Sequence, residues 1–266
     1  ESLNGRYITA EDVNITVEDI EHIFTETSNV CGVAKIHGGS GNPSPFTALG
    51  VYRGIQASCL KTFGDRSVKG KVFALQGAGS VGCHLGKLLS DNGAKVFFCD
   101  INEENVSRFQ EIVAGAERVS IDEIYDVQCD VYSPCALGAT VNDDTIERLK
   151  CKIVAGCANN QLAEPRHGDI LREREILYAP DYLINAGGLM NVSIEFEGWS
   201  EDKATRMVDT IFDTTLEIFK KSDKDGIPVY KATDLLAEQR IQSIRNIKGR
   251  YLGRLAHRFP GRRKIV

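Results

Sequence analysis

From Lys71 onward, short runs of β-branched and aromatic residues alternate with longer segments that mix polar and apolar positions. A strand buried on both faces of a parallel sheet is continuously apolar, and Val96-Phe97-Phe98-Cys99 is such a run. The alternation predicts an α/β fold, in which helices cover a doubly wound sheet. The predicted strands are Lys71–Leu75, Lys95–Cys99, Val131–Ser133, Ile153–Ala155 and Ile176–Tyr178.

A long helix is predicted ahead of the first strand. In Asn42-Pro43-Ser44-Pro45, Ser44 is a candidate cap and Pro45 suits the first turn. The helical pattern continues to about Phe63 and stops before Gly64.

Two further helices are predicted after the sheet. Apolar residues recur at three- and four-residue spacing up to Phe219, which indicates an amphipathic helix ending before Gly226. A second helix is expected to start near the candidate cap Thr233. The apolar positions of the first are Ala204, Met207, Val208, Ile211, Phe212, Thr215 and Phe219.

Composition points to small-molecule chemistry. The 266 residues are 42% hydrophobic and 26% charged, with a net charge of −5 and a sequence pI near 5.6. No basic excess favours nucleic acid or an anionic membrane surface. No apolar run approaches the roughly 18 residues of a membrane span, and no signal-peptide pattern opens the chain, so we expect a cytoplasmic protein.

The eight cysteines contain no CxxC pair, and most lie in apolar runs. We therefore expect inert buried thiols in a reducing compartment, with neither disulfides nor a zinc or other metal site. They are Cys31, Cys59, Cys83, Cys99, Cys129, Cys135, Cys151 and Cys157.

The strongest local motif is Gly77-Ala78-Gly79-Ser80-Val81-Gly82, directly after the first predicted strand and before a predicted helix from Val81 to about Asn92. In this context Gly77 permits a tight turn, Gly79 lets the backbone approach a pyrophosphate, and Gly82 allows close helix packing. The helix start adds amide donors. The motif predicts a dinucleotide site in a Rossmann-like fold.

Asp100 ends the second predicted strand, about twenty residues beyond the glycines. A carboxylate there accepts hydrogen bonds from the adenosine ribose and repels a 2′-phosphate, so NAD is favoured over NADP. No lysine follows the glycines in the pattern of an ATPase.

Several longer stretches resemble the glutamate, leucine, phenylalanine and valine dehydrogenase family, in that family's order and along nearly the whole chain. This resemblance implies reversible, NAD-dependent conversion of an L-amino acid and water into a 2-oxo acid and ammonium. The matching stretches are Gly5–Val13, Ser40–Pro45, Pro134–Thr140, Ala158–Leu162, Ala179–Tyr182 and Asn185–Gly188.

The resemblance also implies roles for individual residues. Asp12 matches the catalytic carboxylate that exchanges a proton with the substrate nitrogen. Ser44 and Thr47 match residues near the nicotinamide carboxamide. On sequence grounds alone, Asp12 is an ordinary acid at a helix start and Ser44 an ordinary cap.

Two segments after strand ends are expected to line the dinucleotide crevice, because ligands of open α/β sheets bind there. The first is Cys135-Ala136-Leu137. The second contains Asn159 and Asn160, one of which orients the nicotinamide ribose or the substrate carboxylate; the sequence leaves open which.

Asn185, Leu189 and Val192 match the family's substrate pocket. An apolar lining suits a branched aliphatic side chain and does nothing for a second carboxylate, so leucine is favoured over glutamate. Phenylalanine and valine remain alternatives, as does ordinary helix core for Leu189 and Val192.

The family uses two lysines in a glycine-rich segment of its N-terminal domain, and this sequence contains no such segment. Two interpretations follow: a part of a longer enzyme whose upstream segment carries the lysines, which we favour, or a non-catalytic NAD-binding module. We expect a remnant of the substrate domain at 1–28, the NAD-binding domain at 29–225, and C-terminal helices at 226–266 packing toward the substrate domain. The full-length form is expected to be a homo-oligomer.

Overall fold

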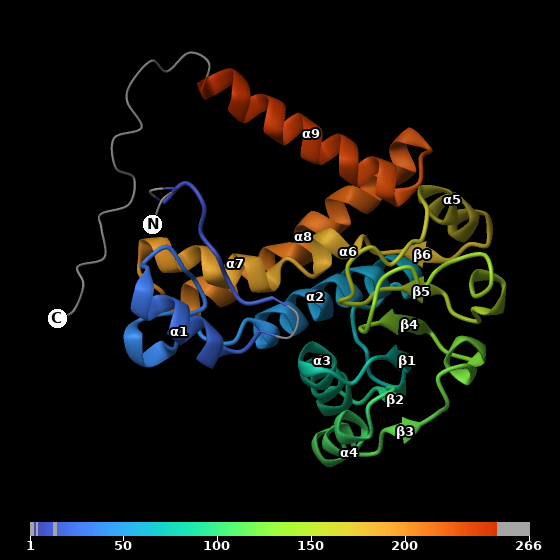
Figure 1. The fold of residues 1–266 in the computed structure, drawn as a ribbon. Helices are drawn as coiled ribbons and strands as arrows, with labels where there is room; N and C mark the ends of the chain where they lie inside the picture. The colour runs from blue at the N-terminus through green and yellow to red at the C-terminus, as the bar shows by residue number, and fades with distance from the viewer. Residues whose placement is uncertain (1–2, 4, 13–14, 249–266) are drawn as a thin grey trace.

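The computed structural model describes residues 3, 5–12 and 15–248, and its centre is a six-stranded parallel sheet (Figure 1). The strand order is β3-β2-β1-β4-β5-β6, so the chain winds outward from β1 in one direction and then from β4 in the other. This is the doubly wound order of a dinucleotide-binding fold. The strands are β1 Val72–Gln76, β2 Lys95–Cys99, β3 Glu117–Arg118, β4 Val131–Pro134, β5 Ile153–Val154 and β6 Leu177–Tyr178.

All five predicted strands are confirmed within one residue at each end, whereas β3 was not predicted. Both of its residues are exposed and charged, so no apolar run marks it. It pairs with β2 through Phe97 and Phe98. An edge strand this short depends on its neighbour, and the sequence carries no signal of its own for it.

Alternate residues of β1 separate the two layers of the core. Phe73 and Leu75 pack on the face covered by the long helices α2 and α8 and by α3, while Ala74 belongs to a second cluster on the other face. Ile124, Leu149 and Leu171 cover that second face. Period-two alternation therefore buries both faces of the sheet, as the continuous apolar runs predicted.

The described helices surround this sheet (Figure 1). The α-helices are α1 Val17–Glu26, α2 Ser44–Phe63, α3 Ser80–Asp91, α4 Glu103–Ile112, α5 Pro165–Glu173, α6 Asp181–Ile184, α7 Gly187–Ser193, α8 Glu201–Asp225 and α9 Val229–Lys248, and the 3-10 helices are η1 Lys35–His37, η2 Glu123–Asp126, η3 Ile146–Arg148 and η4 Ile194–Glu197.

Two predicted caps are wrong although their helices exist. α2 spans Ser44–Phe63 as expected, but the Asn42 side chain accepts the hydrogen bond from Ser44 N at 2.8 Å. Thr233 lies inside α9, where its hydroxyl donates to Val229 O at 2.8 Å. In both places a cap-forming residue type occurs within about one turn inside the helix that it was expected to start.

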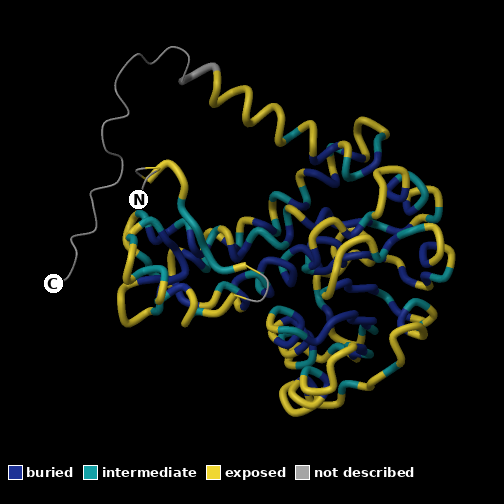
Figure 2. The backbone as a smooth tube through the Cα atoms, in the orientation of Figure 1, coloured by how far each residue is buried: buried dark blue, intermediate teal, exposed yellow. Residues whose placement is uncertain are grey.

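The N-terminal part has a small core of its own, formed by Ile20, Val30 and Val33. It lies beside α2 and α7, away from the strands, and α9 extends from the opposite side with most of its length exposed (Figures 1 and 2). Residues 249–266 of the predicted C-terminal segment, and residues 1–2, 4 and 13–14 of the N-terminal one, lie outside the described residues. No helix in the described part of the chain is long and apolar enough to cross a bilayer.

Candidate functional site

The glycine turn joins β1 to α3 at the carboxyl edge of the sheet. Gly77 has φ of +106°, and a Cβ there would lie 2.7 Å from Ala136 N. A Cβ on Gly82 would lie 2.1 Å from Gly77 O, so the helix packs directly on the turn. Both positions require glycine for steric reasons, as predicted.

Gly79 differs from Gly77 and Gly82, the other two glycines of the motif. Its φ is −67°, and nothing lies within 4 Å of the position of an added Cβ. The turn itself therefore does not require glycine here. The open space lies at the start of α3, where the first amide groups of a helix have no partner within the helix.

Asp100 follows β2 and reaches back to the glycine turn. Its Oδ2 accepts a hydrogen bond from Ala78 N at 2.6 Å, and its Oδ1 accepts one from Asn102 N at 2.8 Å. Gly77 N donates to Cys99 O at 2.8 Å, which ties the same two segments together again. The predicted acid and the predicted glycines are thus one hydrogen-bonded unit.

The loops after β4 and β5 form the neighbouring part of this edge. Ala136 contacts the glycine turn, and the carbonyl oxygens of Asn159 and Asn160 lie 2.5 and 2.9 Å from a Cβ built on Gly138. Ala139 N donates to Asn160 O at 2.7 Å. Backbone contacts therefore hold the two loops together, whereas the side chain of Leu137 is 75% exposed at the edge.

The two asparagines have different surroundings. Asn159 Oδ1 accepts a hydrogen bond from Asn185 Nδ2 at 2.6 Å, and the same amide donates to Cys157 O at 3.2 Å. Asn160 is exposed, with φ of +52°. Asn159 and Asn185 thus act as a pair, which joins the loop after β5 to the segment before α7.

The first turns of α2 and α7 meet beside these loops. Cβ atoms built on Gly187 and Gly188 would lie 2.0 Å from Phe46 O and 2.4 Å from Thr47 Oγ1. Ser44 is buried on the same helix start, and the Thr47 hydroxyl donates to Pro43 O at 3.2 Å. The glycines allow α7 to begin against α2, so both helix starts lie next to the loop after β5.

Known proteins similar to this chain in sequence and fold identify its family. A profile of the glutamate/leucine/phenylalanine/valine dehydrogenase family matches residues 97–249, and a leucine dehydrogenase of Thermoactinomyces intermedius is 54% identical over 95% of this chain and 69% of its own length. The chain belongs to this dehydrogenase family. Its members are amino-acid dehydrogenases, and NAD is the cofactor of the leucine dehydrogenases among them.

Two other members help to place the chain within the family. A phenylalanine dehydrogenase of Caldalkalibacillus thermarum is 40% identical over 91% of this chain and 66% of its own length. The crystal structure of an L-tryptophan dehydrogenase from Nostoc punctiforme superimposes with a TM-score of 0.79 at 39% identity, covering 92% of this chain and 70% of that one. The leucine enzyme is thus the nearest of these three in sequence.

Asp12, the family's catalytic carboxylate by resemblance, is exposed and lies on the N-terminal part rather than at the strand ends. Its segment runs beside residues 29–31, where Thr9 N donates to Asn29 O at 3.1 Å and Cys31 N donates to Thr9 O at 2.8 Å. Burial raises the pKa of the adjacent Glu11. The position of Asp12 therefore depends on how the segment 30–41 is held against the dehydrogenase core.

Glu195, to which no sequence pattern assigned a role, holds that segment. Only 3% of the residue is exposed, and its Oε1 accepts hydrogen bonds from Gly32 N at 2.8 Å, from Ser40 N at 2.7 Å and from the Ser40 hydroxyl. Glu195 comes just after α7, three residues beyond Val192. An acid between two apolar neighbours, in Ile194-Glu195-Phe196, was the available signal, because an acid is rarely buried without partners.

The predicted pocket residues divide between the surface and the core. Leu189 is 72% exposed on α7, whereas Val192 is 8% exposed and packs inward. Leu189 is thus available to a ligand, and the alternative of ordinary helix core applies better to Val192. Leu189 lies in the first turn of α7, one residue after Gly188, and Val192 lies about one turn further along the helix.

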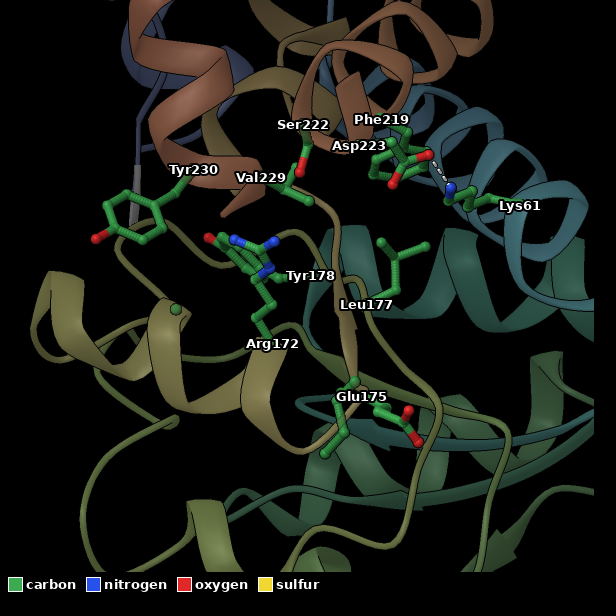
Figure 3. Close-up of a pocket in the computed structure, with 12 residues that line it drawn as sticks. Lys61, Arg172, Glu175, Leu177, Tyr178, Phe219, Ser222, Asp223, Val229 and Tyr230 are labelled. Atoms are coloured by element: carbon green, nitrogen blue, oxygen red, sulfur yellow. Dashed lines mark hydrogen bonds and ion pairs between the residues drawn. The ribbon is translucent and has the colours of Figure 1, made fainter. Parts of the chain in front are cut away.

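Two hollows of the molecule lie elsewhere. One of about 180 Å³ lies where α5, α8 and α9 meet β6, and the ion pair between Lys61 and Asp223 lies at its margin (Figure 3). The other, of about 570 Å³, lies between the first turns of α2 and the outer side of α3. Neither is lined by a residue predicted to bind NAD. Among the described residues, no group of three or more His, Cys, Asp or Glu side chains is arranged to hold a metal ion.

Proposed function

We propose that this chain is the NAD-binding part of a leucine dehydrogenase, which oxidatively deaminates L-leucine with NAD and water to 4-methyl-2-oxopentanoate, ammonium and NADH. The observation that carries the proposal is the 54% identity to a leucine dehydrogenase over 95% of the chain. The hydrogen-bonded unit of the glycine turn and Asp100 supports the cofactor assignment.

The residues at the sheet edge fit a dinucleotide. The open space beside Gly79 admits a pyrophosphate against the start of α3, whose amide groups and dipole favour an anion. Asp100 lies where the adenosine ribose hydroxyls would be bound, and its charge disfavours a 2′-phosphate. Ser44, Thr47, Ala136 and Asn159 are positioned to hold the nicotinamide end. When bound, NAD supplies the acceptor for the hydride from the substrate Cα.

The chain's own groups then bind and orient the amino acid. We assign to Asp12 the transfer of a proton to and from the substrate nitrogen, a task that requires its carboxylate within hydrogen-bond reach of that atom. The Asn159–Asn185 pair is placed to orient polar groups of the ribose or the substrate. Leu189 offers an apolar surface to the side chain, which suits leucine and gives a second carboxylate no partner.

An NADH titration tests the cofactor site. NADH fluorescence is followed on the wild type and on Asp100→Ala, with Asp91→Ala as the matched control, because Asp91 is exposed on α3 and pairs with Lys87 in the same helix. We expect Asp100→Ala to raise the NADH Kd about tenfold, which is about 1.4 kcal/mol. The control should bind as the wild type does, and equal affinity of all three proteins would refute the role of Asp100.

Substrate choice is tested by NADH formation with L-leucine, L-valine, L-phenylalanine and L-glutamate, measured on a protein that also carries the family's two lysines upstream of this chain. We expect the highest kcat/KM with a branched-chain substrate, and Asp12→Asn should reduce kcat about 100-fold or more. A preference for phenylalanine would favour the aromatic branch of the family. NADH binding without turnover of any of the four by that longer protein would favour a non-catalytic NAD-binding module, whereas absent turnover by this chain alone is expected because it lacks the two lysines.

The domain bounds, the oligomeric state and the cellular location of the protein are proposed from the family resemblance and from the number of cysteines. We propose that residues 29–225 form the NAD-binding domain, that 1–28 belong to the substrate domain and that 226–266 pack toward it. We further propose a homo-oligomer, which sedimentation would check, in the cytoplasm, a reducing compartment that suits a chain with eight free cysteines.

A further inference from the structure

Cys135 and Cys157 lie side by side at the carboxyl edge of the sheet. β4 and β5 pair in parallel with Val131 opposite Ile153, and each cysteine lies four residues beyond that pair. Neighbouring strands are about 4.8 Å apart, which falls inside the Cα separation of about 4.4–6.8 Å that a disulfide spans. The register, continued past the two strand ends, therefore places the two cysteines next to each other.

The contacts of these thiols support this placement. Cys157 Sγ donates to Cys135 O at 3.7 Å, and Ser133 Oγ lies 3.5 Å from Cys135 Sγ. A hydrogen bond from the Cys157 thiol lowers the pKa of Cys135, and the same interaction, together with burial, raises the pKa of Cys157. One thiol is thus inclined to ionise while the other keeps its proton beside it.

The other cysteines differ from this pair. Burial raises the pKa of Cys59 and Cys99 to about 12 and that of Cys151 to about 11. These are the inert thiols that the sequence predicted for all eight positions. Cys135 and Cys157 are only half-buried, so the prediction that all eight thiols are buried is wrong at these two positions.

We propose that Cys135 and Cys157 form an oxidation site at which a hydroperoxide converts the two thiols into a disulfide, and that this disulfide weakens NAD binding. The second half of the proposal rests on the proposed function. The first half concerns the thiols alone.

The reaction balances in two steps. The Cys135 sulfur attacks the peroxide, so that an S–O bond forms, the O–O bond breaks, and the leaving oxygen departs as water or an alcohol with the thiol proton; Cys135 is oxidised to a sulfenic acid. The Cys157 sulfur then attacks the Cys135 sulfur. An S–S bond forms, the S–O bond breaks, and hydroxide leaves as water with the Cys157 proton.

The disulfide would act directly on the candidate site. Cys135 precedes Ala136, which contacts the glycine turn, and Cys157 O accepts the hydrogen bond from Asn185 that also holds Asn159. Joining the two sulfur atoms fixes the torsion angles of both side chains and removes the hydrogen bond that the Cys157 thiol donates to Cys135 O, which moves the backbone of the two loops. The groups that receive the nicotinamide end shift with them.

Peptide mapping tests the site itself. The protein is treated with hydrogen peroxide, its remaining thiols are alkylated, and it is digested with trypsin without reduction; cleavage after Lys150 and Lys152 separates the two cysteines. We expect a linked pair of peptides that contain Cys135 and Cys157 and together lack two hydrogen atoms. Cys157→Ser should abolish the link, whereas Cys129→Ala should leave it intact. Separate sulfinic acids on the two residues, or a link between other cysteines, would overturn the proposal.

NADH titration of the same samples tests the consequence. We expect oxidation to raise the NADH Kd on the order of tenfold, dithiothreitol to reverse the change, and Cys157→Ser to remove the sensitivity to peroxide. A linked protein with unchanged NADH affinity would overturn the regulatory half. If the reduced protein fails to bind NADH, the proposed function fails, while the mapping still decides whether the oxidation site exists.

Discussion

The glycine turn and the hinge, which we define as residues 30–41, both position the candidate site, but different forces hold them. The turn is held by steric fit and by hydrogen bonds between nearby segments: Ala78 N and the Asp100 carboxylate are 22 residues apart in sequence. The hinge is held by the buried Glu195 carboxylate, which is 163 residues from Gly32 and 155 from Ser40.

This difference determines how each region fails. The turn tolerates no added volume at Gly77, whereas the hinge needs one acceptor for three donors. Removing a buried acceptor leaves its donors without partners, and each such donor costs about 1–3 kcal/mol. A substitution in one region should therefore leave the other intact.

The largest effect is expected from Gly77→Val. A β-branched residue at φ of +106° is strained, and its Cβ would overlap the Ala136 backbone, so we expect a loss of about 4 kcal/mol in the free energy of unfolding. Urea unfolding measures the loss. Gly79→Ala is the control: it should cost about 1 kcal/mol or less and still weaken NADH binding, because its open space is needed only by the ligand. Equal destabilisation by the two substitutions would contradict this division of roles.

A smaller loss, about 3 kcal/mol, is expected from Glu195→Ala. Glu195→Gln keeps an oxygen in place and should recover more than half of it. Amide exchange separates the two regions: the Gly32 and Ser40 amides should exchange faster, while Gly77 N, bonded to Cys99 O, should not change. Glu197→Ala, at an exposed position two residues away, should change stability by less than about 0.5 kcal/mol. Faster exchange at Gly77 would show that the two regions are not independent.

The contrast between near and distant partners also explains which residues could be predicted from the sequence. Gly77, Gly82 and Asp100 were identified because their spacing along the chain already describes their contacts. Five strands were found because burial on both faces leaves an apolar run, and β3 was missed because Glu117 and Arg118 leave none.

Residues whose role depends on distant partners were not found. Glu195 has its partners more than 150 residues away, and only the folded chain shows that its oxygen is the common acceptor. The pairing of Cys135 with Cys157 likewise depends on the register of β4 and β5. At the start of α2, Asn42 and Ser44 are both cap-forming residue types, but Pro43 occupies the N-cap position and the Asn42 side chain accepts the hydrogen bond from Ser44 N.

The smallest effect concerns an exposed charge network and sharpens the contrast with the buried Glu195. Asp143 accepts a hydrogen bond from Arg166 Nη2 at 2.5 Å, and its other oxygen lies 3.2 Å from His167 Nε2. The Arg166 guanidinium, and then His167, lower the pKa of Asp143 to about 2. The pKa of this aspartate is lower in the folded state than in the unfolded state, where it is near 3.8. Its charge therefore stabilises the fold at any pH above the unfolded pKa. This contribution is lost as the pH falls toward the folded pKa.

Asp143→Asn should therefore lower the urea midpoint slightly and by a constant amount above about pH 5, and the difference from the wild type should shrink as the pH falls from about 4 toward 2. Asp144→Asn, at the adjacent exposed position, controls for the change in net charge. A difference that grows on acidification would show that Asp143 is more acidic in the unfolded chain than in the folded one, which is the opposite sign. Water screens exposed ion pairs, so we attribute the importance of a carboxylate in this fold to its burial rather than to its number of charged partners. A loss of stability in Asp143→Asn as large as that in Glu195→Ala would contradict this view.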